Sequence, residues 1–257
     1  MFKVASANIR FDNPQDGRHD WAGRRILLSS LLNDFCADIF GTQEGREEQI
    51  KDLCSLLPNH TLVEEHREWI EERMYPCIFV NSQNIEVISS GDIWLSETPT
   101  IGGSKSFNSA FPRLCTWIKA KHKHRDFNFF YVNTHLDHVL SSTRSEQIQV
   151  LIDEVKRIND QNLPIIVTGD FNESPQEEVR DKLISQFSNL YDPWTKHGHL
   201  EETSYHKFDG LNPEGARIDW IIADKFFESK SIRLAKENQK GIFPSDHFPV
   251  LAEFTIS

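Results

Sequence analysis

The run Pro-Ile-Ile-Val-Thr at residues 164–168 limits the fold of this chain more than any other segment. An unbroken β-branched run suits a strand that is buried on both faces, as in sheets that helices cover. Further strand-like runs lie at residues 2–9, 38–42, 77–80, 85–95, 114–121, 127–132, 218–223 and 250–256. Apolar residues at helical spacing lie at 21–35, 47–57 and 141–159. This mixture of strands and interspersed helices predicts a layered α/β sandwich.

The organisation of the chain favours one domain that spans residues 1–257. We find no internal repeat, no low-complexity tract and no linker rich in Pro, Gly or Ser. Six Trp and eighteen Phe residues supply enough apolar area for a large core. Ser141 or Ser142 is expected to cap the helix that begins there, with Glu146 in its first turns.

Charge and cysteine usage narrow the class of protein. The formal net charge of -11 argues against a protein that follows long nucleic acids with a broad basic face. Three of the four cysteines, Cys36, Cys77 and Cys115, have apolar neighbours and are expected to be buried. No apolar run reaches the length of a membrane span, and the first residues do not resemble a signal peptide. We therefore expect a soluble, cytoplasmic protein with reduced thiols and no obligate protein partner.

Polar residues that can bind a metal or move a proton lie at the ends of the predicted strands: most follow a strand, Asp219 lies at the start of one, and Asp246 and His247 precede the last. They are Asn8, Glu44, His135, Asp170, Asn172, Asp219, Asp246 and His247. Taken singly they also have structural explanations, since Asn8 suits a turn, Glu44 a helix cap and His135 a core position. Jointly they favour a functional site, because loops at the strand ends of a rigid scaffold commonly carry catalytic groups. Carboxylate, amide and imidazole groups hold hard cations and move protons around a phosphate, which predicts a metal-dependent phosphoesterase.

These residues belong to six motifs that occur in a fixed order along the chain. The motifs are Asn8, Gln43-Glu44, Thr134-His135, Gly169-Asp170-Phe171-Asn172, Arg217-Ile218-Asp219 and Ser245-Asp246-His247. In order and spacing, and over nearly the whole chain, the series resembles the endonuclease/exonuclease/phosphatase superfamily. Three further segments resemble a bacterial subgroup related to the nocturnin and deadenylase branch: Trp21-x-x-Arg24-Arg25, residues 94–99 and Pro112-Arg113. The resemblance implies a four-layer α/β sandwich of two packed mixed β-sheets flanked by helices, with the site at one end.

The resemblance also implies a cofactor. Glu44, with Asn8 and Asp246, would hold Mg²⁺ or Mn²⁺ through oxygen ligands and waters. One branch of the superfamily has an acidic residue that pairs with the first imidazole, and here Glu71 and Glu72 compete for that place, with Glu72 favoured. The apurinic branch has an acid two residues after the first Asn, where this chain has Arg10, which argues against cleavage at abasic sites.

The same resemblance implies the catalytic roles. Asp170 and Asn172 would position or deprotonate the attacking water and bind a phosphate oxygen. His247, oriented by Asp219, would act as a base or as a donor to the phosphoryl group, while His135 would stabilise the developing charge. The identity of the base is left open between Asp170 and His247.

Substrate-binding candidates lie in the loops around these motifs. Arg113 is expected either to grip a substrate phosphate with its planar fork or to form a structural ion pair. His206 and Phe208 are expected either to line a pocket that stacks a base or sugar or to pack internally. The charge runs at residues 64–73 and 121–125 are interpreted as solvated segments, the second as a hairpin turn.

Three functions are compatible with these patterns. The first is hydrolysis of a phosphodiester or phosphomonoester of a nucleotide, sugar or similar small molecule, which the acidic charge favours. The second is a nuclease that acts on single-stranded RNA or DNA. The third is a catalytically silent binding module, which ranks last because every residue of the core set is present.

Overall fold

A computed structural model of the chain describes residues 1–256, so Ser257, the last residue of the predicted domain, lies outside the described residues. Within this part the chain forms two six-stranded sheets. The strands of the first sheet, in spatial order, are β11 (Phe227–Leu234), β12 (Val250–Ile256), β1 (Phe2–Asn8), β2 (Ile39–Gly45), β4 (Tyr75–Asn81) and β3 (His60–Leu62). Those of the second are β5 (Ile85–Trp94), β6 (Leu114–His122), β7 (Phe127–His135), β8 (Ile165–Asp170), β10 (Asp219–Asp224) and β9 (Leu190–Tyr191).

Both sheets are mixed, because each contains one parallel pair among antiparallel ones. The parallel pairs are β1 with β2 and β7 with β8. Each is joined by a connection that carries a helix, as a parallel pair requires. The first connection carries the 3-10 helix η1 (Pro14–His19) and α1 (Trp21–Phe35), and the second carries α3 (Ser141–Ile158).

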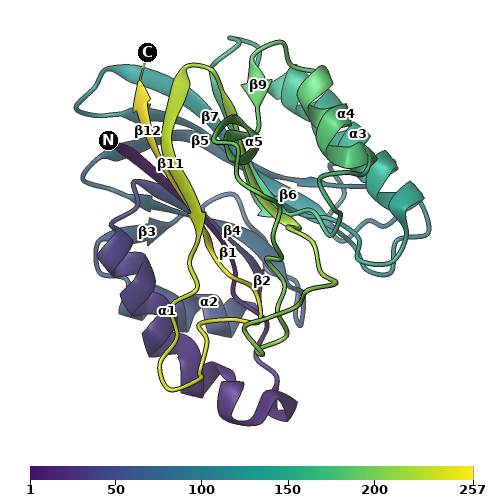
Figure 1. The fold of residues 1–257 in the computed structure, drawn as a ribbon. Coiled ribbons are helices and arrows are strands. Elements are labelled where there is room, and N and C mark those ends of the chain that lie inside the picture. The colour runs from purple at the N-terminus through teal and green to yellow at the C-terminus, as the bar shows by residue number, and fades with distance from the viewer. Residues whose placement is uncertain (257) are drawn as a thin grey trace.

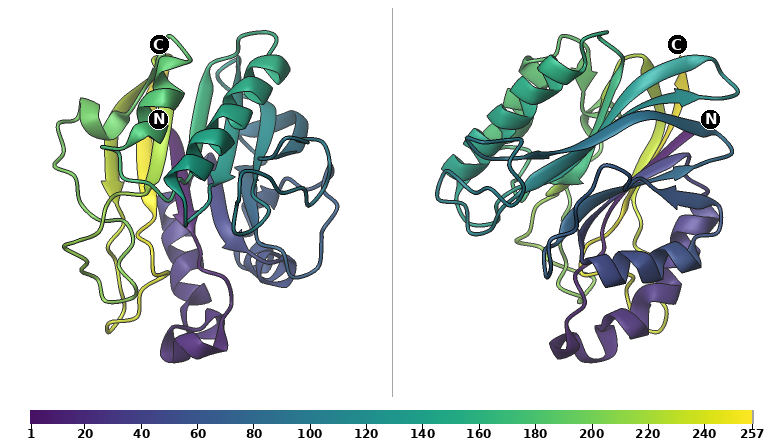
Figure 2. Two further views of the ribbon diagram at one scale, coloured as in Figure 1. Left: turned by 90° about the vertical axis from the view of Figure 1, so that its right-hand side faces the viewer. Right: turned by 180° about the vertical axis from the view of Figure 1, so that it is seen from behind.

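The helices cover the outer faces of the two sheets. Helices α1 and α2 (Glu47–Leu56) lie on the first sheet, and α3 and α4 (Glu178–Ser185) on the second, as Figures 1 and 2 show. A one-turn helix, α5 (Pro193–Lys196), follows β9. The order helix, sheet, sheet, helix confirms the predicted four-layer α/β sandwich of two mixed sheets.

Three apolar clusters fill the spaces between these layers. The central cluster lies between the sheets and contains Phe2, Ile39, Ile118, Phe129 and Ile166, all of them buried. A second cluster lies under α1 and α2, and a third under α3 and α4. Every residue of β8 is buried, which confirms the two-sided burial predicted from its β-branched run.

Elements without a strong apolar period escaped the sequence analysis. These are β3, β9, β11, α4 and α5. Strand β11 is the longest of the missed strands, and a register shift between Ser229 and Ser231 interrupts its alternation of buried and exposed residues. Because a bulge places two residues opposite one, it breaks the period of two by which a strand is detected.

Two local predictions were wrong. The N-cap of α3 is Leu140 and not Ser141 or Ser142; the carboxylate of Asp137 accepts hydrogen bonds from the backbone N–H groups of residues 139 and 140. The Ser141 hydroxyl donates instead to Glu173. Cys36 is exposed, because it terminates α1 in a left-handed conformation with φ of 54°, whereas Cys77 and Cys115 are buried as predicted. All four cysteines are free thiols.

No helix within residues 1–256 combines the length and the apolar character that a membrane crossing requires.

Candidate active site

The predicted site residues converge because both parallel strand pairs end at the same edge of the sandwich. In the first sheet Asn8 lies beside Gln43, next to Glu44 at the end of β2. In the second sheet Asp170 lies between His135 on β7 and Asp219 on β10. The packing of one sheet on the other then brings the ends of β1 and β8 together across the core.

The amide of Asn8 joins the two sheets at this edge. Its Nδ2 donates to Glu44 Oε1 at 3.1 Å and to Asp170 Oδ2 at 2.9 Å, and lies 3.5 Å from His247 Nε2. The amide oxygen accepts a hydrogen bond from the backbone N–H of Arg10 at 2.9 Å. Through its amide N–H groups Asn8 therefore holds the two carboxylates in place, and its role as a metal ligand stays a prediction.

The backbone is left-handed at three residues that shape the site. Arg10, Glu44 and Asn172 have φ values of 52°, 69° and 52°. At Glu44 this conformation accompanies a register shift between β2 and β4, where the pairing skips from Thr42 to Gly45. Non-glycine residues in this region are uncommon and gather at functional sites. The bulge turns the Glu44 side chain toward Asn8 at the end of the neighbouring strand.

His247 is held by Asp219, as predicted. Its Nδ1 lies 2.8 Å from Asp219 Oδ2, and the same carboxylate oxygen accepts a hydrogen bond from the Ser204 hydroxyl at 2.6 Å. Nε2 of the ring therefore faces the cluster. Burial alone would lower the pKa of His247, but the carboxylates of Asp219, Asp170 and Asp246 outweigh it and hold that pKa well above its usual value.

Asp170 lies at the centre of the carboxylates. Its Oδ1 accepts a hydrogen bond from the Asn172 backbone N–H at 2.9 Å. Burial, followed by the charge of Asp219, raises the pKa of Asp170 to about 7. The Asn172 side chain donates to the carbonyl of Leu136 at 3.0 Å, so it fixes the loop after β7.

Arg113 and His135 form the opposite side of the site. Arg113 Nη1 lies 3.0 Å from His135 Nδ1, and Nη2 lies 3.2 Å from His138 Nδ1. Because a guanidinium only donates, Nδ1 of His135 must accept, which places the ring proton on Nε2. That nitrogen lies 3.6 Å from Asp170 Oδ2. Burial, with the charge of Arg113, holds the pKa of His135 well below its usual value, so the ring is neutral at pH 7.

Arg113 was expected either to grip a substrate phosphate or to form a structural ion pair, and its environment distinguishes between these two roles. Only 6% of the residue is exposed, and its Nε has no partner among residues 1–256. Within the same residues no carboxylate lies within ion-pair distance of its nitrogens; its two close contacts are imidazoles. The structural ion pair considered for Arg113 is therefore not found, and a buried positive charge faces the site without a direct counter-ion.

These groups line one cleft of about 870 Å³. Glu71, Glu72 and Arg73 form part of its wall, so the run at 64–73, interpreted as a solvated segment, contributes to the site. Neither Glu71 nor Glu72 contacts His135 in the part of the chain that the structure describes, since Arg113 holds its Nδ1. The predicted pairing of Glu71 or Glu72 with His135 is therefore not found among the described residues, and the guanidinium of Arg113 occupies that place.

Two of the predicted substrate-binding residues lie outside this cleft. His206 is fully buried and stacks on Phe248 at 3.9 Å between ring centroids, and Phe208 stacks on His19 at 4.6 Å. His206 packs internally, which was the alternative interpretation, while Phe208 is half-buried and packs against the half-buried His19. The neighbouring Tyr205 lines the cleft instead.

The cleft also contains residues that the sequence analysis did not assign, namely Phe11, Arg46, Ile70, Met74, Phe111 and Tyr205. These residues lie in loops and carry no periodic signal, so only the folded arrangement reveals them. Asp246, a predicted metal ligand, also lines the cleft. Its Oδ1 accepts a hydrogen bond from the Ser245 hydroxyl at 3.2 Å, and its Oδ2 lies 3.8 Å from Arg10 Nε.

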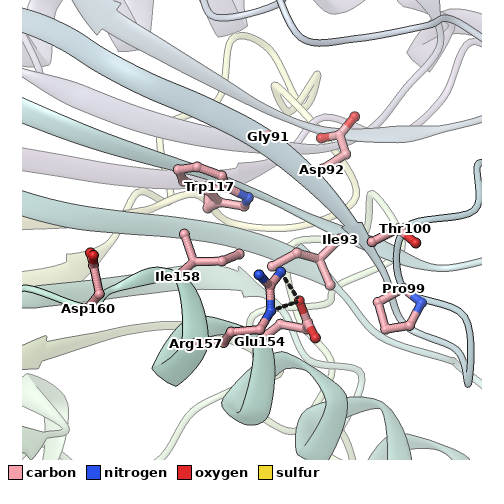
Figure 3. A pocket seen from close by; sticks show the side chains of 10 residues that line it. All are labelled: Gly91, Asp92, Ile93, Pro99, Thr100, Trp117, Glu154, Arg157, Ile158 and Asp160. Carbon is pink, nitrogen blue, oxygen red and sulfur yellow. Dashed lines mark hydrogen bonds and ion pairs between the residues drawn. The ribbon is translucent and has the colours of Figure 1, made fainter.

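A second cavity of about 440 Å³ lies between β5, β6 and the C-terminal end of α3 (Figure 3). The side chains around it include Trp117 and Asp92. Its guanidinium group, that of Arg157, is already paired with Glu154 on the same helix. This cavity therefore lacks the unpaired charge and the imidazoles that distinguish the first cleft.

The donor set of the first cleft suits a divalent cation. Glu44, Asp170 and His247 each offer one ligand atom, and these atoms lie within 4.8 Å of one another. Carboxylate oxygens are preferred ligands of Mg²⁺ and Mn²⁺, and a cation would relieve the crowding of negative charge around Asp170.

Fold and site together define a class of protein. Two packed mixed sheets carry, at one end, carboxylates beside two imidazoles and a buried guanidinium. The model of the Endonuclease/Exonuclease/phosphatase family matches residues 5–247, and the chain belongs to this family.

The chain is similar to two proteins of known structure and to a yeast exonuclease. The structure of a mannosyl-6-phosphatase from Bacteroides thetaiotaomicron VPI-5482 is 29% identical, has a TM-score of 0.90, and matches over 100% of both chains. The human nocturnin catalytic domain is 20% identical with a TM-score of 0.77, over 100% of this chain and 93% of that one, and shares the fold. The RNA exonuclease NGL1 of Saccharomyces cerevisiae is 22% identical over 92% of this chain and 85% of its own length. The membership of the endonuclease/exonuclease/phosphatase superfamily predicted from the sequence is confirmed.

Proposed function

We propose that this protein is a divalent-metal-dependent hydrolase of phosphate esters of small molecules, with phosphorylated sugars as the first candidates. One observation carries the proposal: a buried guanidinium without a direct counter-ion, Arg113, faces a cluster of carboxylates across a single cleft. The guanidinium of Arg113 suits a phosphoryl group, and the carboxylates suit a cation. Metal-assisted phosphoester hydrolysis uses an anion-binding group and a cation at adjacent positions.

Mg²⁺ or Mn²⁺ is the proposed cofactor. Glu44, Asp170 and Asp246 offer oxygen ligands. The bound cation would neutralise charge on the non-bridging oxygens of the phosphoryl group. Asn8 would hold Glu44 and Asp170 in place through its amide N–H groups.

The remaining roles follow from the hydrogen-bond directions. Arg113 would bind phosphoryl oxygens, and His135 would donate to them from Nε2, because its Nδ1 is occupied. His247 turns Nε2 toward the same point, since Asp219 holds its Nδ1. The proton of the attacking water would pass to Asp170 or to His247, and both stay candidates for the base.

The proposed substrate class rests on charge and on similarity. The net charge of -11 disfavours long nucleic acids, and the structure that is 29% identical over its full length is described as a mannosyl-6-phosphatase. The similarity to an RNA exonuclease keeps short single-stranded nucleic acid as the second candidate. The cytoplasmic location and the single domain over residues 1–257 stay predictions.

A substrate panel tests the proposal. We would measure hydrolysis of mannose 6-phosphate, p-nitrophenyl phosphate, bis-p-nitrophenyl phosphate and a labelled single-stranded oligonucleotide with Mg²⁺, Mn²⁺ or EDTA. Turnover of a small ester that EDTA and Glu44→Ala abolish is expected, while Glu48→Ala, at an exposed position two residues into α2, retains it. Cleavage of the oligonucleotide alone would favour the nuclease. Binding of phosphates without turnover under any cation would favour the silent module.

A further inference from the structure

We propose that Phe111, backed by His138, forms a platform at the rim of the cleft that binds the flat face of a ring in the leaving group of the substrate. The proposal rests on the proposed phosphoesterase function and adds the class of leaving group, which is a cyclic one. A pyranose offers an apolar C–H face to such a platform, and a nucleobase offers a π face.

Phe111 differs from the other aromatic residues of the cleft in its exposed ring. The guanidinium of Arg10 lies over Phe11 at 4.2 Å, and Tyr205 packs on His247 at 4.8 Å between centroids. Phe111 stacks on His138 at 5.9 Å with an interplanar angle of 17°, and 48% of the residue is exposed. Folding therefore leaves much of this apolar ring in water, where a ligand can cover it.

The backbone under the two rings is fixed by partly buried hydrogen bonds. The Ser109 hydroxyl donates to the carbonyl of Phe111 at 2.7 Å, and the Ala110 N–H donates to Asp137 Oδ1 at 2.9 Å. The other oxygen of the Asp137 carboxylate accepts from the backbone N–H groups after His138, at 2.8 and 3.0 Å. One buried carboxylate thus ties the two loops together. A ring on such a frame loses little conformational freedom when a ligand binds.

The platform lies beside the group proposed to bind the phosphate. Phe111 precedes Arg113 by two residues, and Nη2 of Arg113 contacts the Nδ1 of His138 at 3.2 Å. All three side chains line the same cleft. An ester whose phosphoryl group contacts Arg113 therefore has its leaving group within reach of the platform.

The test compares esters that share the phosphate and differ in the ring. The substrates are mannose 6-phosphate, adenosine 5′-monophosphate and the ringless glycerol 3-phosphate; the variants are Phe111→Ala and Phe111→Tyr. We expect Phe111→Ala to lower kcat/KM for the preferred cyclic ester about tenfold through KM, or about 1.4 kcal/mol. Hydrolysis of glycerol 3-phosphate should change less than about twofold, and Phe111→Tyr, which keeps the ring, should stay near wild type.

Ile101→Ala is the matched control, because Ile101 lies in the same β5–β6 connection, is 57% exposed, and does not line the cleft. An equal loss on cyclic and ringless esters, or no loss on either, would overturn the platform. If the wild-type protein hydrolyses none of the three esters, the phosphoesterase proposal fails. The platform is then tested separately, by measuring with calorimetry how the same phosphates bind to the wild-type protein and to Phe111→Ala. Weaker binding of the cyclic phosphate alone in Phe111→Ala supports it, and equal or absent binding refutes it.

Discussion

Replacing Arg113 by Met should stabilise the protein while it removes activity. Arg113 is buried, its Nε has no partner in the described chain, and its other nitrogens contact only the rings of His135 and His138. Burial lowers the pKa of Arg113, which means that the folded protein disfavours its charged form. Transfer of an unpaired ion from water into a protein costs several kcal/mol.

The expected gain is the balance of two opposing terms. Arg113→Met removes the desolvation of the charge and buries an unbranched apolar chain of similar length. It also removes two hydrogen bonds to imidazole nitrogens, each worth about 1 kcal/mol, and the longer-range attraction of Asp170 and Glu44. We expect a net stabilisation of about 1–3 kcal/mol, and hence a rise in Tm of about 2–8 °C for a chain of this size.

Urea denaturation and thermal melting, with and without inorganic phosphate, measure this balance. Phosphate should raise the Tm of the wild-type protein and leave that of Arg113→Met unchanged, because a ligand stabilises only the form that binds it. Arg113→Lys keeps the charge and serves as the control for stability. Destabilisation of Arg113→Met by more than about 1 kcal/mol, together with an intact phosphate effect, would refute the assignment of Arg113 as an anion site.

Three further predictions concern the metal site, the orientation of His247 by Asp219, and the stability that the Asp92–Arg67 ion pair gives to the fold. Mg²⁺ should raise the Tm of the wild-type protein but not of Glu44→Ala, and equal shifts in both would contradict the metal assignment. Asp219→Asn should lower kcat about 10- to 100-fold at unchanged KM, since it loosens the orientation of His247, whereas a change in KM alone would argue against that role. Asp92→Asn should destabilise the protein by about 3–5 kcal/mol at pH 7, because it leaves Arg67 buried without its partner. The pKa of Asp92 is depressed, so its contribution is present above pH ~4 and lost as the pH falls; urea titrations at pH 7 and pH 3 should show a smaller difference at the lower pH.

The sequence predicted the positions of the site residues better than their partners. Strand exits are visible because apolar runs end abruptly at polar residues, and this is how Glu44 and Asp170 were selected, whereas His247 was selected because it lies just before the last apolar run. The partner of His135 was not visible, because Arg113 immediately precedes β6, His135 ends β7, and the two side chains meet only through the pairing of these strands. The sequence instead suggested Glu71 or Glu72 as the partner of His135.

Local sequence also gave no sign of which loop residues face the cleft. His206, Phe208 and Tyr205 lie within four positions of one another, yet only Tyr205 lines the cleft. The loop has no period from which to read a face, and its direction is set by contacts such as the stacking of His206 on Phe248. The buried Arg67 was hidden for a similar reason, since its partner Asp92 lies 25 residues away on β5 of the opposite sheet.

One half of the cleft, around Asp170, gathers negative charge, and the other half holds the positive charge of Arg113. Both charges are unfavourable in the folded protein, which links stability to function. Burial, followed by the charge of Asp219, raises the pKa of Asp170 to about 7, while Arg113 holds a positive charge that no adjacent carboxylate balances. Each half alone opposes folding, because a buried charge without a counter-ion is unfavourable. A cation beside Glu44 and a phosphoryl group beside Arg113 would relieve both halves at once. The protein therefore holds part of its binding energy as unfavourable charge in the folded state, and this explains why the residues that destabilise the cleft are the ones proposed to work in it.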